Sequence, residues 1–168
     1  MKIIYIDMQN IHKSTESMGW IIDWGLFYQY LWQKFTPDKV IMFVGYIQKY
    51  KHFYDKLIGI GYEMNFKEVL VRSDGSIKWD VDIDIAIQAM KDIHSKKVSS
   101  AYLISGDADY NTLIREWQNA GVFGKLIVPR LDKTLYILRK ASGSKLQPLT
   151  DIRHLIEKKQ KDPPWGES

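Results

Sequence analysis

The sequence contains no cysteine among its 168 residues. This absence excludes disulfide bonds, zinc sites built on thiolates and cysteine nucleophiles. Long apolar runs are also missing, and none reaches the roughly 18 residues that a membrane-spanning helix requires. The first residues, Met1–Asp7, reach a charge too early for the apolar region of a signal peptide. We therefore expect a cytoplasmic protein in a reducing compartment.

Two familiar signatures of chemistry are absent as well. The sequence has neither the glycine-rich dinucleotide pattern nor the P-loop pattern that cradles phosphates. Its histidines have no metal-ligand spacing and fall on different predicted elements, so we expect each to be a surface residue. They are His12, His52, His94 and His154.

The composition is that of an ordinary soluble protein, with 45% hydrophobic and 26% charged residues. We expect one domain over residues 1–157, followed by a basic tail at 158–168 that lacks apolar periodicity and is predicted to be disordered. The net charge of +4 reflects either a few solvated lysines or, if aspartates gather in one pocket, a basic surface around that pocket. The second arrangement suits a polyanion held near a bound metal ion.

Strand and helix patterns alternate along nearly the whole chain. This alternation predicts an α/β fold with a mostly parallel sheet covered on both faces, and ligands in such sheets bind at the carboxyl ends of the strands. The turn residues Ser73–Ser76 predict a hairpin or a flexible loop. The predicted strands are Lys2–Asp7, Val40–Ile47, Ser99–Ile104, Lys125–Pro129 and Lys145–Leu149, with an extended segment at Tyr62–Arg72. The predicted helices are Asp23–Phe35, Gln48–Ile60, Asp80–His94, Asp109–Asn119, Leu131–Ala141 and Asp151–Lys159.

Carboxylates stand in three segments that the predicted sheet would bring together. Asp7 ends the first strand, and Asp107 and Asp109 follow a later one. Asp7 alone would equally fit an Asx turn or a helix cap, and Asp109 alone a helix cap. Carboxylates near apolar surroundings are costly unless a cation or hydrogen bonds compensate them, so their convergence predicts a hard divalent metal ion. Ser105 is a candidate hydrogen-bond partner of a neighbouring carboxylate.

The helix Asp80–His94 presents its aspartates in different directions. At about 100° per residue, Asp82 falls near the centre of the apolar stripe, whereas Asp84 points almost oppositely. We therefore expect Asp82 to face the site and Asp84 to be solvated or salt-bridged. The stripe consists of Ile85, Ala86, Ala89, Met90 and Ile93.

Two aromatic residues flank these aspartates. Trp79 precedes Asp82, and Tyr110 follows Asp109. Each fits two roles, stacking on a nucleobase or packing against the neighbouring chain, and the sequence leaves both open.

Three motifs, in this order, resemble those of the NYN domains in the PIN-like ribonuclease superfamily, and within them the bacterial LabA-like group. The resemblance continues through Gly121 and Leu138–Ala141 to about Ile156, so it covers nearly the whole chain apart from the tail. The motifs are Tyr5–Ile11, Val81–Ile87 and Ile104–Tyr110.

The resemblance implies a three-layer α/β/α fold of the PIN-like type. It also implies that one or two Mg²⁺ or Mn²⁺ ions are bound by Asp7, Asp82, Asp107 and Asp109, with Asn10 supporting the site.

Two positions depart from the family pattern. Trp79-Asp80 stands where the family usually has Lys-Gly, so that the lysine is displaced to Lys78. Ser144 or Gly143 stands where an Asp is common before the last strand. Both departures concern contacts to the substrate and leave the four carboxylates in place.

The leading hypothesis is a metal-dependent ribonuclease that cleaves single-stranded or flexible RNA internally. The metal ion would lower the pKa of a water molecule for attack on a phosphodiester. We expect RNA as the partner, no membrane association, and a homodimer among the candidate assemblies. The candidate substrate contacts are Asn10, Lys78, Arg130 and Arg139.

Two alternatives remain open at this point. A binding or regulatory module without turnover would use the tryptophans and the basic tail, and removal of Lys158–Ser168 would then abolish binding. A phosphohydrolase would release phosphate from nucleotides or other small phosphates without cleaving RNA. Related carboxylate sites on three-layer folds also serve phosphohydrolase chemistry, so the fold alone does not separate these functions.

Overall fold

The structure is a computed structural model, and it describes residues 1–159. Its centre is a six-stranded sheet in the order β3-β2-β1-β6-β7-β8, in which every neighbouring pair is parallel. This arrangement confirms the predicted parallel sheet. The strands are β1 (Lys2–Asp7), β2 (Lys39–Gly45), β3 (Glu63–Lys67), β6 (Ser100–Ile104), β7 (Phe123–Val128) and β8 (Leu146–Pro148).

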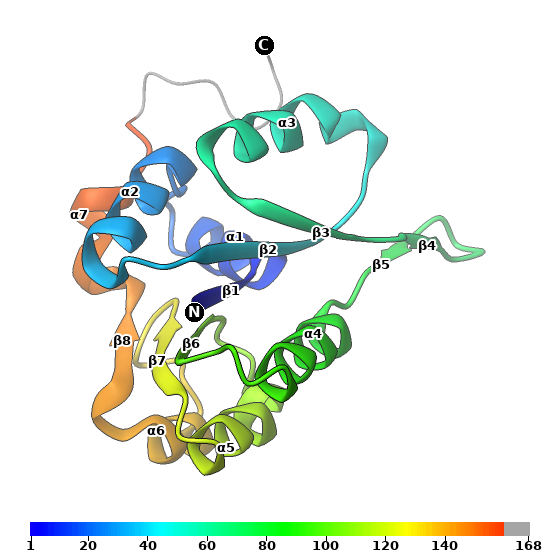
Figure 1. Ribbon diagram of the computed structural model, residues 1–168. Helices are drawn as coiled ribbons and strands as arrows, with labels where there is room; N and C mark the ends of the chain where they lie inside the picture. The colour runs from blue at the N-terminus through cyan, green and yellow to red at the C-terminus, as the bar shows by residue number, and fades with distance from the viewer. Residues whose placement is uncertain (160–168) are drawn as a thin grey trace.

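Helices cover both faces of the sheet, so the fold has the three layers that were expected (Figure 1). One face is covered by α1 (Met8–Ser17), α2 (Trp24–Phe35), α3 (Lys51–Ile60) and α7 (Arg153–Ile156). The other face is covered by α4 (Asp82–His94), α5 (Asn111–Asn119) and α6 (Tyr136–Ser142). Short 3₁₀ segments occur at η1 (Gln48–Tyr50), η2 (Ala108–Tyr110), η3 (Gly143–Lys145) and η4 (Leu149–Ile152).

The central strand β1 contributes to two separate cores. Side chains alternate across a strand, so Ile4 and Ile6 pack toward α1 and α2, whereas Ile3 and Tyr5 pack toward α4 and α5. All four are fully buried. Burial on both faces explains why this strand appears in the sequence as a continuous apolar run.

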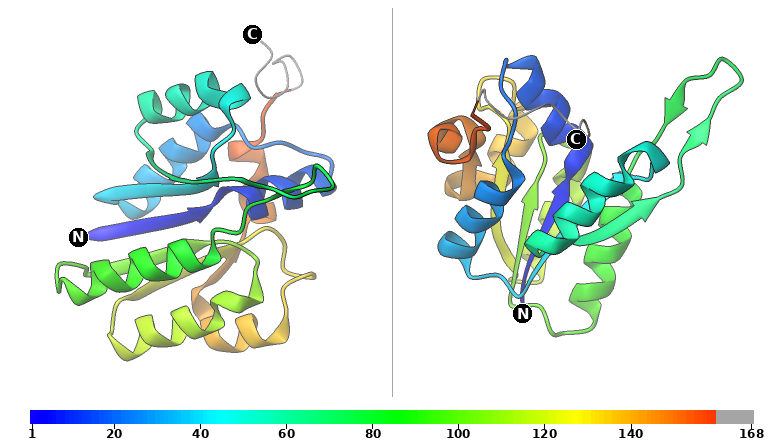
Figure 2. Two further views of the ribbon diagram at one scale, coloured as in Figure 1. Left: turned by 90° about the vertical axis from the view of Figure 1, so that its right-hand side faces the viewer. Right: turned by 90° about the horizontal axis from the view of Figure 1, so that it is seen from above.

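The turn segment forms a hairpin, which confirms one of the two expected outcomes. Strands β4 (Leu70–Val71) and β5 (Ile77–Lys78) pair antiparallel, and Asp74 accepts a hydrogen bond from the Ser76 amide at 2.8 Å within the turn. The hairpin projects away from the body of the molecule (Figure 2). Its apolar side chains are exposed, so it contributes little to the core.

Several predicted elements need correction. Helix α1 was not predicted, because of its residues only Met8, Ile11 and Thr15 are buried and the rest are mainly polar. Helix α6 begins five residues later than expected, because the guanidinium of Arg139 donates to the carbonyls of Leu131 and Thr134 and satisfies them without a helix.

Smaller differences concern element ends and one side chain. The helix expected at Asp109–Asn119 starts as the 3₁₀ turn η2, and the last helix ends at Ile156 rather than Lys159. Met90 was placed in the buried stripe of α4 but is 41% exposed, because α4 packs mainly through Ile85 and Ala89.

The order of the strands fixes where a ligand can bind. From β1 the chain moves outward to β2 and β3, then returns to the other side of β1 as β6 and continues to β7 and β8. The carboxyl ends of β1 and β6 therefore flank the point where the strand order reverses, which is the usual ligand position in such sheets.

Among residues 1–159, no helix is long and apolar enough to cross a bilayer. The tail predicted to be disordered lies outside the described residues from position 160 onward.

Candidate metal centre

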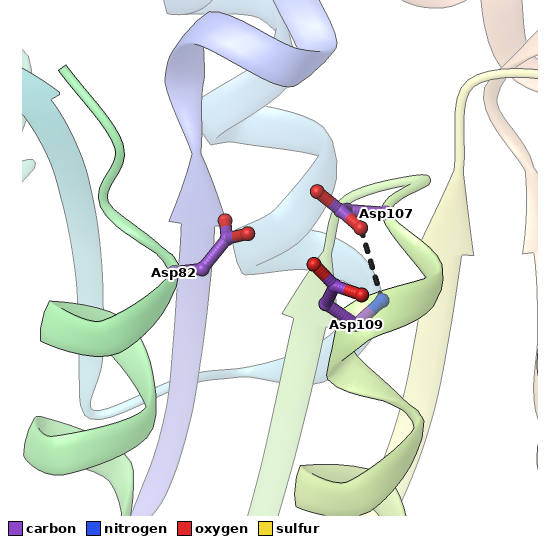
Figure 3. A group of neighbouring side chains, drawn as sticks. All are labelled: Asp82, Asp107 and Asp109. Carbon is purple, nitrogen blue, oxygen red and sulfur yellow. Dashed lines mark hydrogen bonds between the residues drawn. The ribbon is translucent and has the colours of Figure 1, made fainter. Parts of the chain in front are cut away.

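Three aspartates from two parts of the chain meet beside the carboxyl end of β6. Asp82 is the first residue of α4, and Asp107 and Asp109 lie in the turn that leads into α5. One carboxylate oxygen of each lies within 4.8 Å of the others, and Figure 3 shows Asp82 facing the other two across a gap. We call these three residues the acidic cluster. The structure thus brings together three of the four carboxylates that the sequence singled out.

The turn that carries Asp107 and Asp109 is fixed by its own side chains. Asp107 is the N-cap of η2, and its Oδ1 accepts a hydrogen bond from the Asp109 amide at 2.9 Å. The sequence had offered Asp109 for this capping role, so the structure transfers the role to the earlier aspartate. The hydrogen bond uses one oxygen of Asp107 and leaves the other for a ligand.

Asp7, the last residue of β1, lies deeper than the acidic cluster and is only 4% exposed. Its Oδ1 accepts a hydrogen bond from the Asn10 amide at 3.1 Å and so caps helix α1. Its Oδ2 accepts from the hydroxyls of Ser105 at 3.4 Å and Tyr110 at 3.2 Å. Asp7 is therefore a helix cap, as the simpler interpretation held, and a member of the site's hydrogen-bond network. The prediction that Ser105 supports a carboxylate is consistent with this contact.

Tyr110 joins Asp7 to the acidic cluster. Its hydroxyl lies 3.2 Å from Asp7 Oδ2 and 2.9 Å from Asp82 Oδ1. A phenol has one proton, so it donates fully to only one carboxylate at a time, and the other is left to find a proton or a cation. The sequence had left Tyr110 between stacking and packing; the ring is buried and the hydroxyl bridges two acids.

The pKa values of these groups reflect burial first and the crowding of negative charge second. Burial raises the pKa of Asp82 to about 7, and the charges of Asp107, Asp7 and Asp80 add to the effect, against the hydrogen bond from Tyr110. Burial also raises the pKa of Asp7, opposed by hydrogen bonds from the Asn10 amide and Tyr110. A nearby positive charge would stabilise the charged forms of both carboxylates.

No lysine or arginine among residues 1–159 forms an ion pair with Asp7 or with the acidic cluster. Four carboxylates without a basic partner are the hard oxygen donors that Mg²⁺ and Mn²⁺ prefer. The residues present therefore fit a divalent metal ion. Asp84 is different, because it pairs with Lys67 at 2.8 Å, which agrees with the expectation that it is salt-bridged.

Asn10 holds two parts of the site at a fixed separation. Its Oδ1 accepts a hydrogen bond from the Gly106 amide at 2.8 Å, which ties the start of α1 to the loop after β6. Space around Gly106 is tight, since a Cβ there would lie 2.9 Å from Cδ of Pro129. A glycine is therefore required where this loop passes the end of β7.

The three basic residues proposed as substrate contacts lie in different settings. Lys78 is exposed on the projecting hairpin, and Arg139 binds the backbone carbonyls described above. The guanidinium of Arg130 pairs with Asp132, with Nε at 2.6 Å from Oδ1. Contact with a phosphate remains a prediction for each of them.

A polar cavity of about 330 Å³ adjoins Asn10. It lies between one side of α1, which contributes Asn10, Ser14 and Ser17, and the loop that carries Arg130 and Lys133. Hydroxyls and two cations line it. This cavity was not predicted because α1 was not predicted, although Asn10, Ser14 and Ser17 have the helical spacing i, i+4, i+7.

Comparison with known proteins gives the family. The NYN domain model matches residues 2–144, which is most of the chain. A crystal structure of a protein of unknown function from Vibrio parahaemolyticus superposes with a TM-score of 0.73 at 22% sequence identity, over 92% of this chain and 94% of that chain. This likeness shows the fold alone. A search of curated proteins found no match. The chain belongs to the NYN domain family, and so to the PIN-like nuclease superfamily.

Proposed function

We propose that this protein is a metal-dependent endoribonuclease of the LabA-like group, with the nuclease domain over residues 1–157. The single observation that carries the proposal is the acidic cluster, in which three carboxylates meet without a lysine or arginine partner among the described residues. Its position at the carboxyl end of β6, in an NYN fold, is where a nucleic-acid substrate would meet them.

Asp82, Asp107 and Asp109 would hold the Mg²⁺ or Mn²⁺, and Asp7 is a candidate fourth ligand. When bound, such an ion supplies a lowered water pKa and compensates negative charge on the phosphate. Ser105, Asn10 and Tyr110 keep Asp7 and Asp82 in place through their hydrogen bonds. These contacts orient the carboxylates before the substrate arrives, so little reorganisation is needed on binding.

The polar cavity provides the place for the backbone of the substrate next to the acidic cluster. Lys133 brings positive charge to its rim, Arg130 lies there paired with Asp132, and Ser14 and Ser17 bring hydroxyl donors. Groups of this kind contact phosphates in nucleic-acid complexes. Since Asn10 lines the cavity and binds Gly106, the cavity and the acidic cluster share one rigid support.

The test is cleavage of an end-labelled single-stranded RNA with Mg²⁺ or Mn²⁺, and with a chelator. We expect internal cleavage that requires the metal and is lost in Asp107→Asn, which retains a good helix cap. The matched control is Asp55→Asn, because Asp55 is an exposed acid paired with Lys51 on α3. Nucleotides incubated in parallel should release no phosphate. Intact RNA with wild-type protein that demonstrably binds Mn²⁺ would overturn the proposal.

A further inference from the structure

A second cavity, of about 380 Å³, lies on the other side of α1 from the polar cavity. Its walls come from α1, the end of β2, the segment around Tyr50 and Tyr54, and Trp79. Most of its surface is apolar, and we call it the apolar cavity. Its volume lies within the roughly 300–1,000 Å³ of small-molecule sites.

Two residues that line the apolar cavity lie close in sequence to aspartates of the site. Met8, which lines it, directly follows Asp7, and Trp79 stands three residues before Asp82. Successive Cα atoms are about 3.8 Å apart, so the Cα atoms of Trp79 and Asp82 lie within roughly 11 Å of each other. The chain segment from Trp79 to Asp82 therefore links the wall of this cavity to the acidic cluster over a short distance.

Trp79 is held rigidly at the wall of the cavity. Its ring packs so closely on Gly45, the last residue of β2, that a Cβ there would lie 2.4 Å from Cε3 of the indole. Its indole N–H has no hydrogen-bond partner within residues 1–159. The sequence had left Trp79 between packing and stacking; packing on Gly45 fixes the ring, and the residue still lines the cavity.

The polar groups at this cavity suit an uncharged planar ligand with hydrogen-bonding edges. Gln9, His12, Lys13 and Glu16 follow the spacing i, i+3, i+4, i+7 and so share one face of α1. Burial lowers the pKa of His12, which favours an imidazole with one donor and one acceptor nitrogen. His12 was expected at the surface, but it is half-buried here.

The two faces of α1 therefore differ in chemistry. The polar cavity offers hydroxyls and cations, which suit phosphate. The apolar cavity offers aromatic rings and amide and imidazole edges, and its two charged residues, Lys13 and Glu16, carry opposite charges. A single strand whose backbone passes the acidic cluster would present a base to one side and phosphates to the other.

We propose that the apolar cavity binds one nucleobase of single-stranded RNA, beside the phosphodiester at the acidic cluster, with Trp79 and Tyr50 as stacking surfaces and Gln9 and His12 facing the base edge. This inference rests on the proposed function. It adds a subsite that selects an unpaired nucleotide, because a base inside a duplex is not available for stacking on a protein ring.

The experiment measures the affinity of a short fluorescein-labelled single-stranded RNA by anisotropy, in chelator so that no cleavage occurs. We expect Trp79→Ala to weaken binding about tenfold, as for loss of a stacking residue. Trp32→Ala is the matched control, because Trp32 is an exposed tryptophan on α2, outside the cavity. Tyr50→Ala gives a second reading, at a half-buried side chain, if Trp79→Ala does not fold.

A set of RNAs with one abasic position at successive sites completes the test. One abasic site should weaken wild-type binding, and Trp79→Ala should bind the abasic and intact RNAs alike, because the stacking partner is already missing. Wild-type affinity in Trp79→Ala and Tyr50→Ala, or equal binding of every abasic RNA by the wild type, would overturn the subsite. Trp79-dependent binding in chelator, together with intact RNA in the Mn²⁺ cleavage assay, would instead retain the subsite and overturn the nuclease.

Discussion

Acidic residues on the surface and those of the acidic cluster have opposite surroundings. On the surface, Glu157 lies 2.7 Å from Arg153, and this partner lowers the pKa of the carboxyl group. In the cluster, no basic residue of the described chain pairs with Asp82, and its pKa is raised to about 7. The protein has cations available, since the net charge is +4, but places none here. Uncompensated charge of this kind lowers the stability of the folded protein and is typical of a site that awaits a ligand.

The largest effect is expected when a lysine is introduced into the acidic cluster. In Asp109→Lys, the new ammonium would lie beside Asp82 and Asp107 and take the place of a metal ion. We expect cleavage to fall about 1,000-fold or more, since several kcal/mol of transition-state stabilisation are lost. The rate of RNA cleavage with Mn²⁺ measures this.

The control for this variant is Asp55→Lys, which changes the charge equally at an exposed position on α3. It should retain wild-type cleavage. Equal activity of Asp109→Lys and Asp55→Lys would show that the cluster is not the metal centre.

The second prediction concerns the hydroxyl of Tyr110, which lies between Asp7 and Asp82. Tyr110→Phe removes the hydrogen bonds to Asp7 and Asp82, which hold these carboxylates in place and favour their charged forms. We expect Mn²⁺ affinity to fall about 10- to 100-fold, as for other residues that orient metal ligands. Isothermal titration calorimetry measures the affinity.

Tyr5→Phe is the matched control, because Tyr5 is also a buried tyrosine that donates to a carboxylate, Asp92, at 2.7 Å. It should bind Mn²⁺ as the wild type does. If both variants bind with unchanged affinity, the bridging hydroxyl has no part in metal binding.

The third prediction concerns pH. Because the pKa of Asp82 is raised to about 7, this group holds a proton at lower pH that a metal ion must displace. We expect Mn²⁺ affinity to rise about tenfold between about pH 6 and pH 8, with release of a proton on binding. Titrations in buffers of different ionisation enthalpy report this release. An affinity that is constant or falls over this range would contradict the raised pKa.

The smallest expected effects concern the free energy of unfolding, which substitutions of Asp82 and Asp84 should change in opposite directions. A raised pKa means that the contribution of Asp82 to the free energy of unfolding is present below its ordinary pKa of 3.8 and lost as the pH rises through about 7. At neutral pH without metal, Asp82→Asn should therefore stabilise the protein, by about 1 kcal/mol after allowance for solvent screening.

Asp84→Asn is the comparison for this prediction, because Asp84 lies on the same helix but pairs with Lys67. It should destabilise the protein by up to about 1 kcal/mol. Thermal unfolding in chelator measures both variants, and a shift of the same sign in both would contradict the contrast between paired and unpaired acids.

The sequence predicted most of the fold because its strands are buried on both faces. Such strands appear as continuous apolar runs, and Ile3–Ile6 and Leu103–Ile104 are examples. Helix α1 was not predicted, because its polar residues line cavities and its apolar residues are few. The start of α6 was predicted too early because the backbone before it is satisfied by the side chain of Arg139, a residue of α6, which periodicity does not reveal.

The residues of the site also differ in whether local sequence patterns predict them. Asp82 was placed by helical periodicity and Asp107 by its position after a strand, so local patterns were sufficient for them. The bridging role of Tyr110 was not predicted, because it depends on a contact with a residue 103 positions away. The cavities on either side of α1 also require the packed tertiary structure.

The same long separation has a consequence for how the protein is made. Asp7 is synthesised 98 residues before Ser105, and strand β1 lacks its partner β6 until that later segment has emerged. At about 5–20 residues per second, the interval lasts roughly 5–20 s. Throughout it the nascent chain lacks the contacts that join Asp7 to Ser105 and Tyr110, so the candidate metal centre assembles only late in synthesis.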